Sequence, residues 1–162
     1  MGIRAAVGDW IMGTNSVARG RRLVFSMKIS EVLHFDEYYN DSRFKKKKPN
    51  IIGNWRERVG DNMYYKDNGE WKQHTTIYHR DPEIVEKDLK HPFVFISNEF
   101  YYFGDKAVEI PAKFQDLVWK RQGCKSIHPP EIVKAFLTWL QKSLKPGVLG
   151  NPADNDETKG NC

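Results

Sequence analysis

Aromatic and short polar side chains are the residues of this sequence best suited to chemistry, and that chemistry is binding. A flipped or single-stranded nucleic-acid base is held by aromatic rings that stack on its faces and by a few polar groups that read its edge. Both kinds of side chain gather near the ends of expected strands, which predicts a ligand pocket. The candidate ligand-binding residues are Trp10, Thr14, Asn15, Ser16, Asp61, Asn62, Tyr64, Tyr65, Trp71, Tyr101 and Tyr102.

The competing interpretation is that these rings belong to the core, since a single aromatic side chain is buried more often than it lines a ligand site. Trp10 lies within an apolar run, which favours burial. Tyr64 and Tyr65 are consecutive in an expected strand, so only one of them can face a pocket. If all the rings are core residues, the chain is a protein-interaction domain with an exposed apolar patch instead of a pocket.

Two basic segments are the candidate phosphate contacts. The net charge is +5 and the isoelectric point about 9.1, which favours acidic partners, nucleic acid or nucleotide first. The alternative is that the lysines form an ordinary solvated loop. The candidate phosphate-contacting residues are Arg19, Arg21, Arg22, Lys45, Lys46, Lys47 and Lys48.

Signatures of catalysis are weaker. The sequence contains no phosphate-binding GxxxxGK[ST] loop, no GxGxxG, no GxSxG elbow, no HExxH and no CxxC pair. We therefore expect no metal and no cofactor, and favour binding over catalysis. An enzyme acting on a nucleotide or DNA base is the alternative, with an acid–base set of Asp41, Asp61, His74 and His79.

Length and composition predict one globular domain. The chain has 162 residues, of which 40% are hydrophobic and 13% aromatic. It has two cysteines, no apolar run near the roughly 20 residues that span a bilayer, and no signal-peptide pattern. We expect a cytoplasmic protein without membrane association, and the oligomeric state stays open.

Alternation and turn signals predict many short strands. Residues 22–33 form the clearest one, with Leu23, Phe25, Met27 and Ile29 facing the core, antiparallel to residues 10–12 across the polar loop 13–16. Residues 68–69, Asn-Gly, predict a hairpin between residues 63–65 and 70–73. We also expect strands at residues 93–97 and 107–111. Short helices or helical turns are expected at residues 35–39 and 111–118, and another is expected to begin at residue 81.

A helix at residues 129–144 closes the chain, because Ile132, Val133, Phe136, Leu137, Leu140 and Leu144 form one apolar face. Short strands closed by one such helix indicate an α+β, mostly β fold: a small antiparallel barrel with a C-terminal amphipathic helix. A ligand is expected at the barrel mouth. We expect residues 1–147 to form a single domain and residues 148–162 a flexible polar tail.

Five segments carry a resemblance to a known family. They are VGDWIMGTNS at 7–16, LVFSMKI at 23–29, FDEYYNDSRF at 35–44, GDNMYY at 60–65 and FYYFG at 100–104. In this order they resemble the nucleotide modification associated domain 2 family, over residues 7 to about 147. The first two are also similar, more distantly, to PUA-like barrels of the EVE, ASCH and YTH type.

The distant resemblance implies a five- or six-stranded barrel that recognises modified or flipped bases. The nearer resemblance implies a link to DNA or RNA base modification, often in bacteria or phage. In that family an N-terminal strand and loop precede the Gly8-Asp9-Trp10 block, whereas only residues 3–6 precede it here. We therefore expect a truncated start that lacks one strand and part of the pocket wall. The sequence names neither the base nor the type of nucleic acid.

Overall fold

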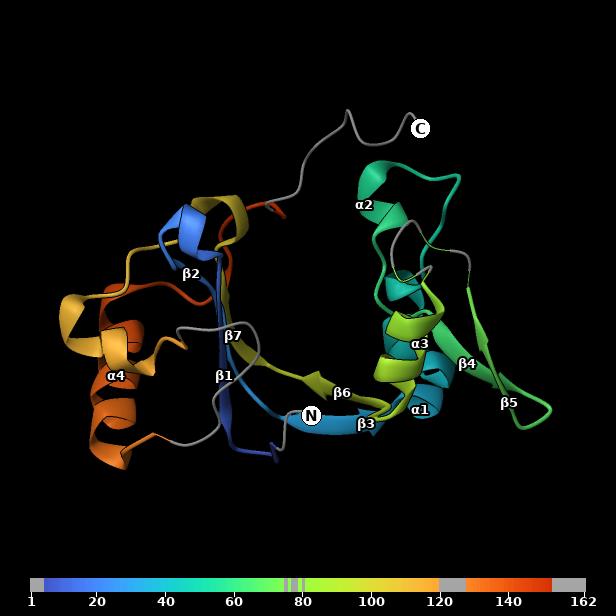
Figure 1. Cartoon of the computed structure of the whole chain (residues 1–162), viewed down its shortest axis with the longest axis horizontal. Helices are drawn as coiled ribbons and strands as arrows, with labels where there is room; N and C mark the ends of the chain where they lie inside the picture. Colours follow the sequence, from blue (N-terminus) through green and yellow to red (C-terminus); the bar gives the residue numbers. More distant parts are fainter. Residues whose placement is uncertain (1–4, 75, 77–78, 80, 120–127, 153–162) are drawn as a thin grey trace. The chain divides into compact units, whose positions relative to one another are not determined.

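The computed structural model describes residues 5–74, 76, 79, 81–119 and 128–152 (Figure 1). Its contacts divide the chain into two compact units. Unit 1 comprises Ile3–Glu31 and Ser97–Cys162, and unit 2 comprises Val32–Ile96. Within the described residues, no helix has the length and apolar character that a membrane span needs.

Unit 1 is built on a four-stranded sheet with the order β1-β2-β7-β8. The strands are β1 (Trp10–Thr14), β2 (Leu23–Lys28), β7 (Glu99–Tyr102) and β8 (Gly147–Val148). β2 pairs antiparallel with β1 and β7, which confirms the expected hairpin, whereas β8 runs parallel to β7. The chain is thus α+β and mostly β, but its described strands form open sheets and no closed barrel.

A β-bulge decides which face of β2 meets the core. Gly13 pairs with Phe25 and Thr14 with Leu23, so Val24 has no partner on β1. The extra residue reverses which side chains of β2 point to each face of the sheet, so Ser26 is buried instead of Phe25. The prediction that Leu23, Phe25, Met27 and Ile29 face the core therefore holds for Leu23 and Ile29, which are buried, and is wrong for Phe25 and Met27, which are only half-buried.

The helix α4 (Pro130–Ser143) lies beside this sheet (Figure 1), and residues of both form the main core of unit 1. Phe136 and Leu140 are the buried residues of α4, which closely matches the helix expected at 129–144. The expected helix at 111–118 is the 3₁₀ helix η4 (Ala112–Leu117), and the expected strand at 107–111 reduces to one bridge between Leu23 and Val108. The buried cluster comprises Leu23, Tyr101, Phe103, Ile110, Phe114, Leu117, Val118, Phe136 and Leu140.

Residues 148–152 belong to unit 1 rather than to a free tail. Val148 completes β8, and the Leu149 amide donates to the Tyr102 carbonyl at 2.8 Å. The Asn151 amide donates to Asp105 Oδ1 at 2.8 Å. The expected flexible tail begins at residue 148, and its residues 153–162 lie outside the described part of the chain.

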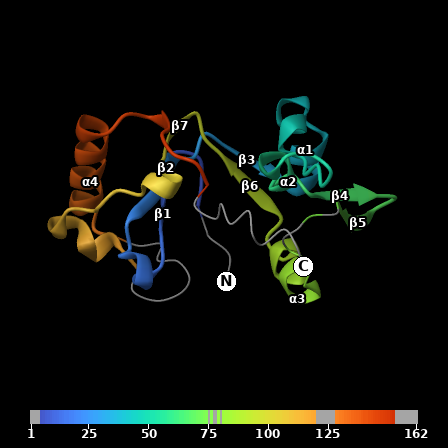
Figure 2. The ribbon, with the colours of Figure 1, turned by 90° about the horizontal axis from the view of Figure 1, so that it is seen from above.

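Unit 2 contains two short two-stranded sheets and three α-helices in its described part (Figure 2). One sheet pairs β3 (Glu31–His34) with β6 (Phe93–Ile96), and the other is the hairpin of β4 (Tyr64–Asp67) and β5 (Glu70–Gln73). The turn residues Asn68 and Gly69 have φ of 49° and 84°, as an Asn-Gly hairpin turn requires. The helices are α1 (Phe35–Asn40), α2 (Trp55–Arg58) and α3 (Pro82–Leu89).

Three further 3₁₀ helices are described: η1 (Val17–Arg19), η2 (Ser42–Lys47) and η3 (Gly104–Lys106). The long strand expected at 22–33 ends at Lys28, and β3 follows as a separate strand of the other sheet. A capping box starts α1, because Glu37 accepts from the His34 amide at 2.8 Å while His34 Nδ1 accepts from the Asp36 amide at 3.5 Å. This cap sets the direction in which α1 presents Tyr38 and Tyr39.

Candidate functional site

Three half-buried rings meet in unit 2 and, with Lys48, form what we call the Tyr39 cluster. Tyr39 comes from α1, Tyr65 from β4, and His74 directly follows β5. The rings of Tyr39 and Tyr65 stack with centroids 4.6 Å apart and planes 19° apart, and His74 lies 5.5 Å from Tyr39 and 5.3 Å from Tyr65. Tyr39 Oη and His74 Nε2 are hydrogen-bonded at 2.8 Å, so the rings hold one another in place.

A cation covers this stack. Lys48 Nζ lies 3.3 Å from the ring centroid of Tyr39, in a cation–π contact. Burial, and then the nearby Lys45, lower the pKa of Lys48, whereas burial, and then Tyr65, raise the pKa of Tyr39. Within the described residues no carboxylate lies at ion-pair distance from Lys48, so an anion would be a favourable neighbour for it.

The other lysines of the run at residues 45–48 continue outward from this cluster. Lys45, Lys46 and Lys47 are exposed in the last turn of η2. Asp41 caps this helix by accepting from the Arg43 amide at 2.9 Å, and it also pairs with the Arg43 guanidinium at 2.6 Å. These hydrogen bonds lower the pKa of Asp41. Lys45, Lys46 and Lys47 are thus part of a capped helix, and Lys48 is its C-cap residue.

Asp61 and Asn62, both predicted ligand-binding residues, connect α1 with η2. Asn62 is only 1% exposed, and its amide nitrogen donates to the carbonyls of Tyr38 (3.1 Å) and Phe44 (3.3 Å). Its backbone amide donates to the Lys47 carbonyl at 3.0 Å. Asp61 is exposed and accepts from the Tyr38 hydroxyl at 2.9 Å. The pair therefore holds the two elements that carry Tyr39 and Lys48.

Tyr64, His79 and Asp88 form a second polar group in unit 2. Asp88 Oδ2 accepts from the Tyr64 hydroxyl at 2.8 Å and lies 2.7 Å from His79 Nδ1. Tyr64 is buried and stacks on Phe35 with centroids 5.2 Å apart. Tyr64 and Tyr65 thus have separate partners, as expected for consecutive strand residues.

Trp71 lies on β5 with different neighbours. Its ring stacks on His34 at 5.5 Å, meets the edge of Phe35 at 6.4 Å, and has Lys66 Nζ 5.1 Å from its centroid. Trp71 is half-buried, so one part of its ring packs and the other is accessible.

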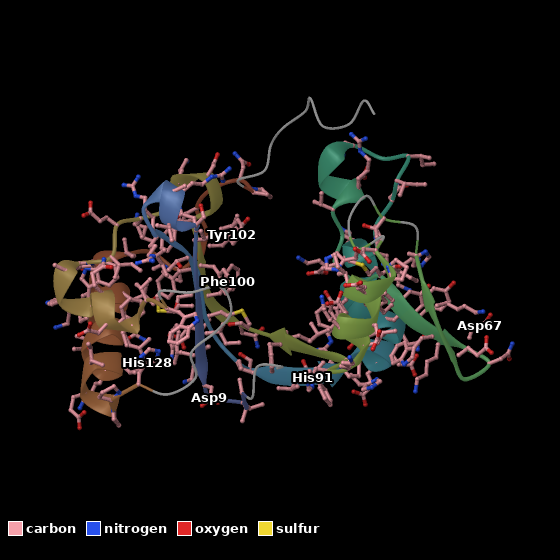
Figure 3. All side chains as sticks on the ribbon, viewed as in Figure 1. Asp9, Asp67, His91, Phe100, Tyr102 and His128 are labelled. Atoms are coloured by element: carbon pink, nitrogen blue, oxygen red, sulfur yellow. The ribbon has the colours of Figure 1, made fainter. Side chains whose placement is uncertain are left out.

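The remaining candidate ligand residues belong to unit 1. Tyr101 is buried in the core, which raises its pKa, and its ring lies 6.5 Å from that of Trp10. Tyr102 shares the opposite face of β7 with Phe100, as Figure 3 shows. Asn15 uses its side-chain oxygen to accept from the Arg22 amide at 2.7 Å. Thr14 ends β1 and is half-buried, and Ser16 is exposed.

The unit 1 arginines surround a tight turn. The backbone carbonyl of Ser16 accepts from the amides of Arg19 (3.0 Å) and Arg21 (3.2 Å). Arg19 and Arg22 are exposed, and Arg21 is half-buried with φ of 52°. These arginines lie in a different unit from the lysine run.

The four expected acid–base residues have separate partners. Asp41 pairs with Arg43, Asp61 with Tyr38, His74 with Tyr39 and His79 with Asp88. Within the described residues, no hydrogen bond or ion pair joins two members of the set. In the described part of the chain, no group of three or more His, Cys, Asp and Glu side chains is placed to hold a metal ion.

Sequence reasoning did not include Tyr39 and Asp88 among the site residues. No local pattern pairs Tyr39 with Tyr65 and His74, which lie 26 and 35 residues further along the chain. For Asp88 a weak signal existed: Asp81-Pro82 marks a helix start, and Asp88 lies in the last turn of that helix.

Comparison with known families decides the relationship. The family described as nucleotide modification associated domain 2 matches residues 2–159. The chain belongs to this family. Membership in nucleotide modification associated domain 2 connects the chain with nucleotide modification and is consistent with a nucleotide or nucleic-acid partner. No match to the chain is found among curated proteins or among solved structures, and the distant likeness to PUA-like barrels stays a prediction.

Proposed function

We propose that this member of the nucleotide modification associated domain 2 family binds a single-stranded or flipped base, stacked against the Tyr39 cluster, with the lysine run contacting the adjoining phosphates. The observation that carries the proposal is the position of Lys48 Nζ, 3.3 Å from the Tyr39 ring centroid. It joins the basic run to the aromatic rings within one unit, and these are the two components of a single-strand binding surface.

The chemistry of each component supports this function. Tyr39, Tyr65 and His74 are partly exposed, so a base can stack beside them without unfolding the unit. Stacking on one aromatic ring stabilises a bound base by about 1–3 kcal/mol. Lys45, Lys46 and Lys47 are exposed and have no ion-pair partner among the described residues, so a phosphate gains charge pairing there. Trp10, Trp71 and Tyr102 are the partly exposed aromatic candidates outside this cluster.

Salt dependence tests the phosphate contacts. The K45A/K46A/K47A variant removes three charges, and we expect the slope of log affinity against log salt for a single-stranded oligonucleotide to fall by about 2. The control variant K134A/K142A/K145A removes three exposed lysines of unit 1 and should change the slope less. Equal slopes for the two variants would show that net charge alone drives binding.

The stacking contact is tested at Tyr65. Tyr65→Phe keeps a ring and should bind like the parent, whereas Tyr65→Leu should weaken binding about tenfold or more. Both variants are first compared with the parent by circular dichroism. If folded Tyr65→Leu binds as tightly as Tyr65→Phe, the Tyr39 cluster is not the base platform.

Acid–base chemistry on a nucleotide or base is the second candidate, and the His79–Asp88 pair favours it. Asp88 holds Nδ1 of His79 and stabilises the positive charge that the ring gains when Nε2 takes a proton. The φ of His79 is 56°, a conformation that costs energy in a residue other than glycine. Nucleotides and oligonucleotides incubated with the wild type and with His79→Asn, followed by mass spectrometry, test this candidate, and unchanged substrates in both reactions would remove it.

A further inference from the structure

Two adjacent aliphatic side chains project into solvent from unit 2. Ile52 is 92% exposed and Ile51 is 45% exposed, in the loop between η2 and α2. Exposed apolar residues scattered singly are common on protein surfaces, whereas two β-branched residues side by side at a loop tip form a protruding apolar point.

Hydrogen bonds hold this loop in one conformation. The Asn50 amide donates to the Glu57 carbonyl at 2.8 Å, and the Gly53 amide donates to the Asn50 carbonyl at 3.0 Å. Glu57 also accepts from the Asn54 amide at 2.8 Å through its carboxylate, and Asn54 accepts from the Glu57 amide at 3.2 Å. The backbone bond between Asn50 and Glu57 closes the loop and leaves the two isoleucines at its tip.

The lysine run lies at the base of the same loop. Gly60 approaches the backbone of Lys47 and Lys48 so closely that an added Cβ would overlap it. The Asn62 amide donates to the Lys47 carbonyl, which joins the far side of the loop to the run. The loop leaves the run at Lys48 and returns beside it at Gly60, so the lysine run lies at the base of the loop that carries the apolar tip.

We propose that Ile51 and Ile52 are a wedge that inserts between base pairs of duplex DNA while Lys45, Lys46 and Lys47 contact the phosphates beside the opened step. Proteins that kink or open a duplex insert apolar side chains between base steps and hold the flanking backbone with basic residues. The inference rests on the proposed function, since an opened step supplies the unstacked base that the Tyr39 cluster receives.

Charge and rigidity favour this partner over the alternatives. The flanking lysines suit a polyanion, and the closed loop keeps the wedge in position before contact, as insertion between stacked bases requires. An anionic membrane surface also combines a charged and an apolar phase, so it is included as an outcome of the test.

The experiment uses a short DNA duplex with 2-aminopurine at its centre, whose fluorescence rises when the base unstacks. Wild-type chain should raise the emission, and I51S/I52S should abolish the rise and weaken duplex binding about tenfold. V17S/V148S, which removes two exposed valines of unit 1, should behave like the wild type. An RNA duplex of the same sequence and phosphatidylserine vesicles are measured alongside.

Each outcome separates the wedge from the base site. If I51S/I52S keeps the parent's single-strand affinity and loses the duplex response, the wedge is supported. If both proteins give the same duplex response, or if I51S/I52S loses vesicle binding instead, the wedge is overturned while single-strand binding still supports the proposed function. If the wild type binds neither probe, both proposals fail. Ile52→Ser alone repeats the test should the double variant not fold.

Discussion

At the scale of single residues, two tyrosine hydroxyls connect stability with pH. Tyr38 and Tyr64 are buried and donate to the carboxylates of Asp61 and Asp88. Burial is the main cause that raises the pKa of each, and the carboxylate adds to it. In the unfolded chain a tyrosine has its ordinary pKa of about 10, so above this pH the folded state keeps protons that the unfolded state loses.

We therefore predict that stability is fully present below pH 10 and decreases above it, by up to about 1.4 kcal/mol per pH unit for each tyrosine. The Y38F/Y64F variant has neither proton to lose, so its unfolding free energy should fall less steeply with alkaline pH. Urea denaturation from pH 8 to 11 measures both slopes. Parallel slopes for variant and wild type would assign the alkaline loss to other groups.

The buried amide of Asn62 is the second prediction at this scale. Asn62→Leu keeps the volume but leaves the carbonyls of Tyr38 and Phe44 without their donor, which should cost about 1–3 kcal/mol of unfolding free energy. We expect weaker oligonucleotide binding as well, because Asn62 holds α1 against η2. The exposed Asn50→Leu serves as the control in the same denaturation series, and a loss of equal size there would contradict the assignment.

At the scale of elements, the pairing of β1 with β2 depends on a glycine. A Cβ placed at Gly13 would overlap the ring of Phe25, its cross-strand partner. The ring thus lies directly over the β1 backbone, and glycine at this position permits that close approach.

A double-mutant cycle tests this contact. Gly13→Ala should destabilise the chain by about 1–3 kcal/mol through overpacking, and Phe25→Ala should destabilise it through lost packing. In the double variant the new methyl group finds the space left by the ring, so the two losses should not add. Thermal unfolding of the four proteins gives the coupling energy, and additive losses would mean that the ring and the glycine do not interact.

At the scale of the whole molecule, contacts gather into two units with different cores. Unit 1 has an aliphatic and aromatic core that includes the fully buried Leu140, and unit 2 relies on ring contacts and hydrogen bonds among Tyr38, Tyr64 and their partners. Proteins unfold locally in cooperative units of this kind, because opening one unit breaks mainly the contacts within that unit.

Leu140→Ala should accordingly lower the protection of unit 1 more than that of unit 2. We expect the free energy of unfolding of unit 1 to fall by about 2–5 kcal/mol. Amide hydrogens of β1, β2 and β7 should then exchange faster, with a smaller change in the hairpin of β4 and β5. Hydrogen-exchange mass spectrometry resolves the two sets of peptides. Equal acceleration in both would show that the units open together.

Family membership and most elements of the fold followed from local sequence patterns. Alternating residues, the Asn-Gly turn at residues 68–69 and the apolar stripe of α4 led to strands, a hairpin and a helix close to those observed. Such patterns are local because side-chain direction repeats every two residues in a strand and every 3.6 in a helix. The separate partners of Tyr64 and Tyr65 follow from the same rule.

Tertiary structure alone decided which residues distant in sequence contact one another. The bulge at Val24 turned Phe25 away from the main core, since a one-residue insertion reverses every later side chain of a strand. The parallel pairing of β8 with β7 and the assembly of Tyr39, Tyr65, His74 and Lys48 join residues distant in sequence. Their association depends on packing and charge across the folded unit, and no periodicity along the chain encodes which distant side chains meet.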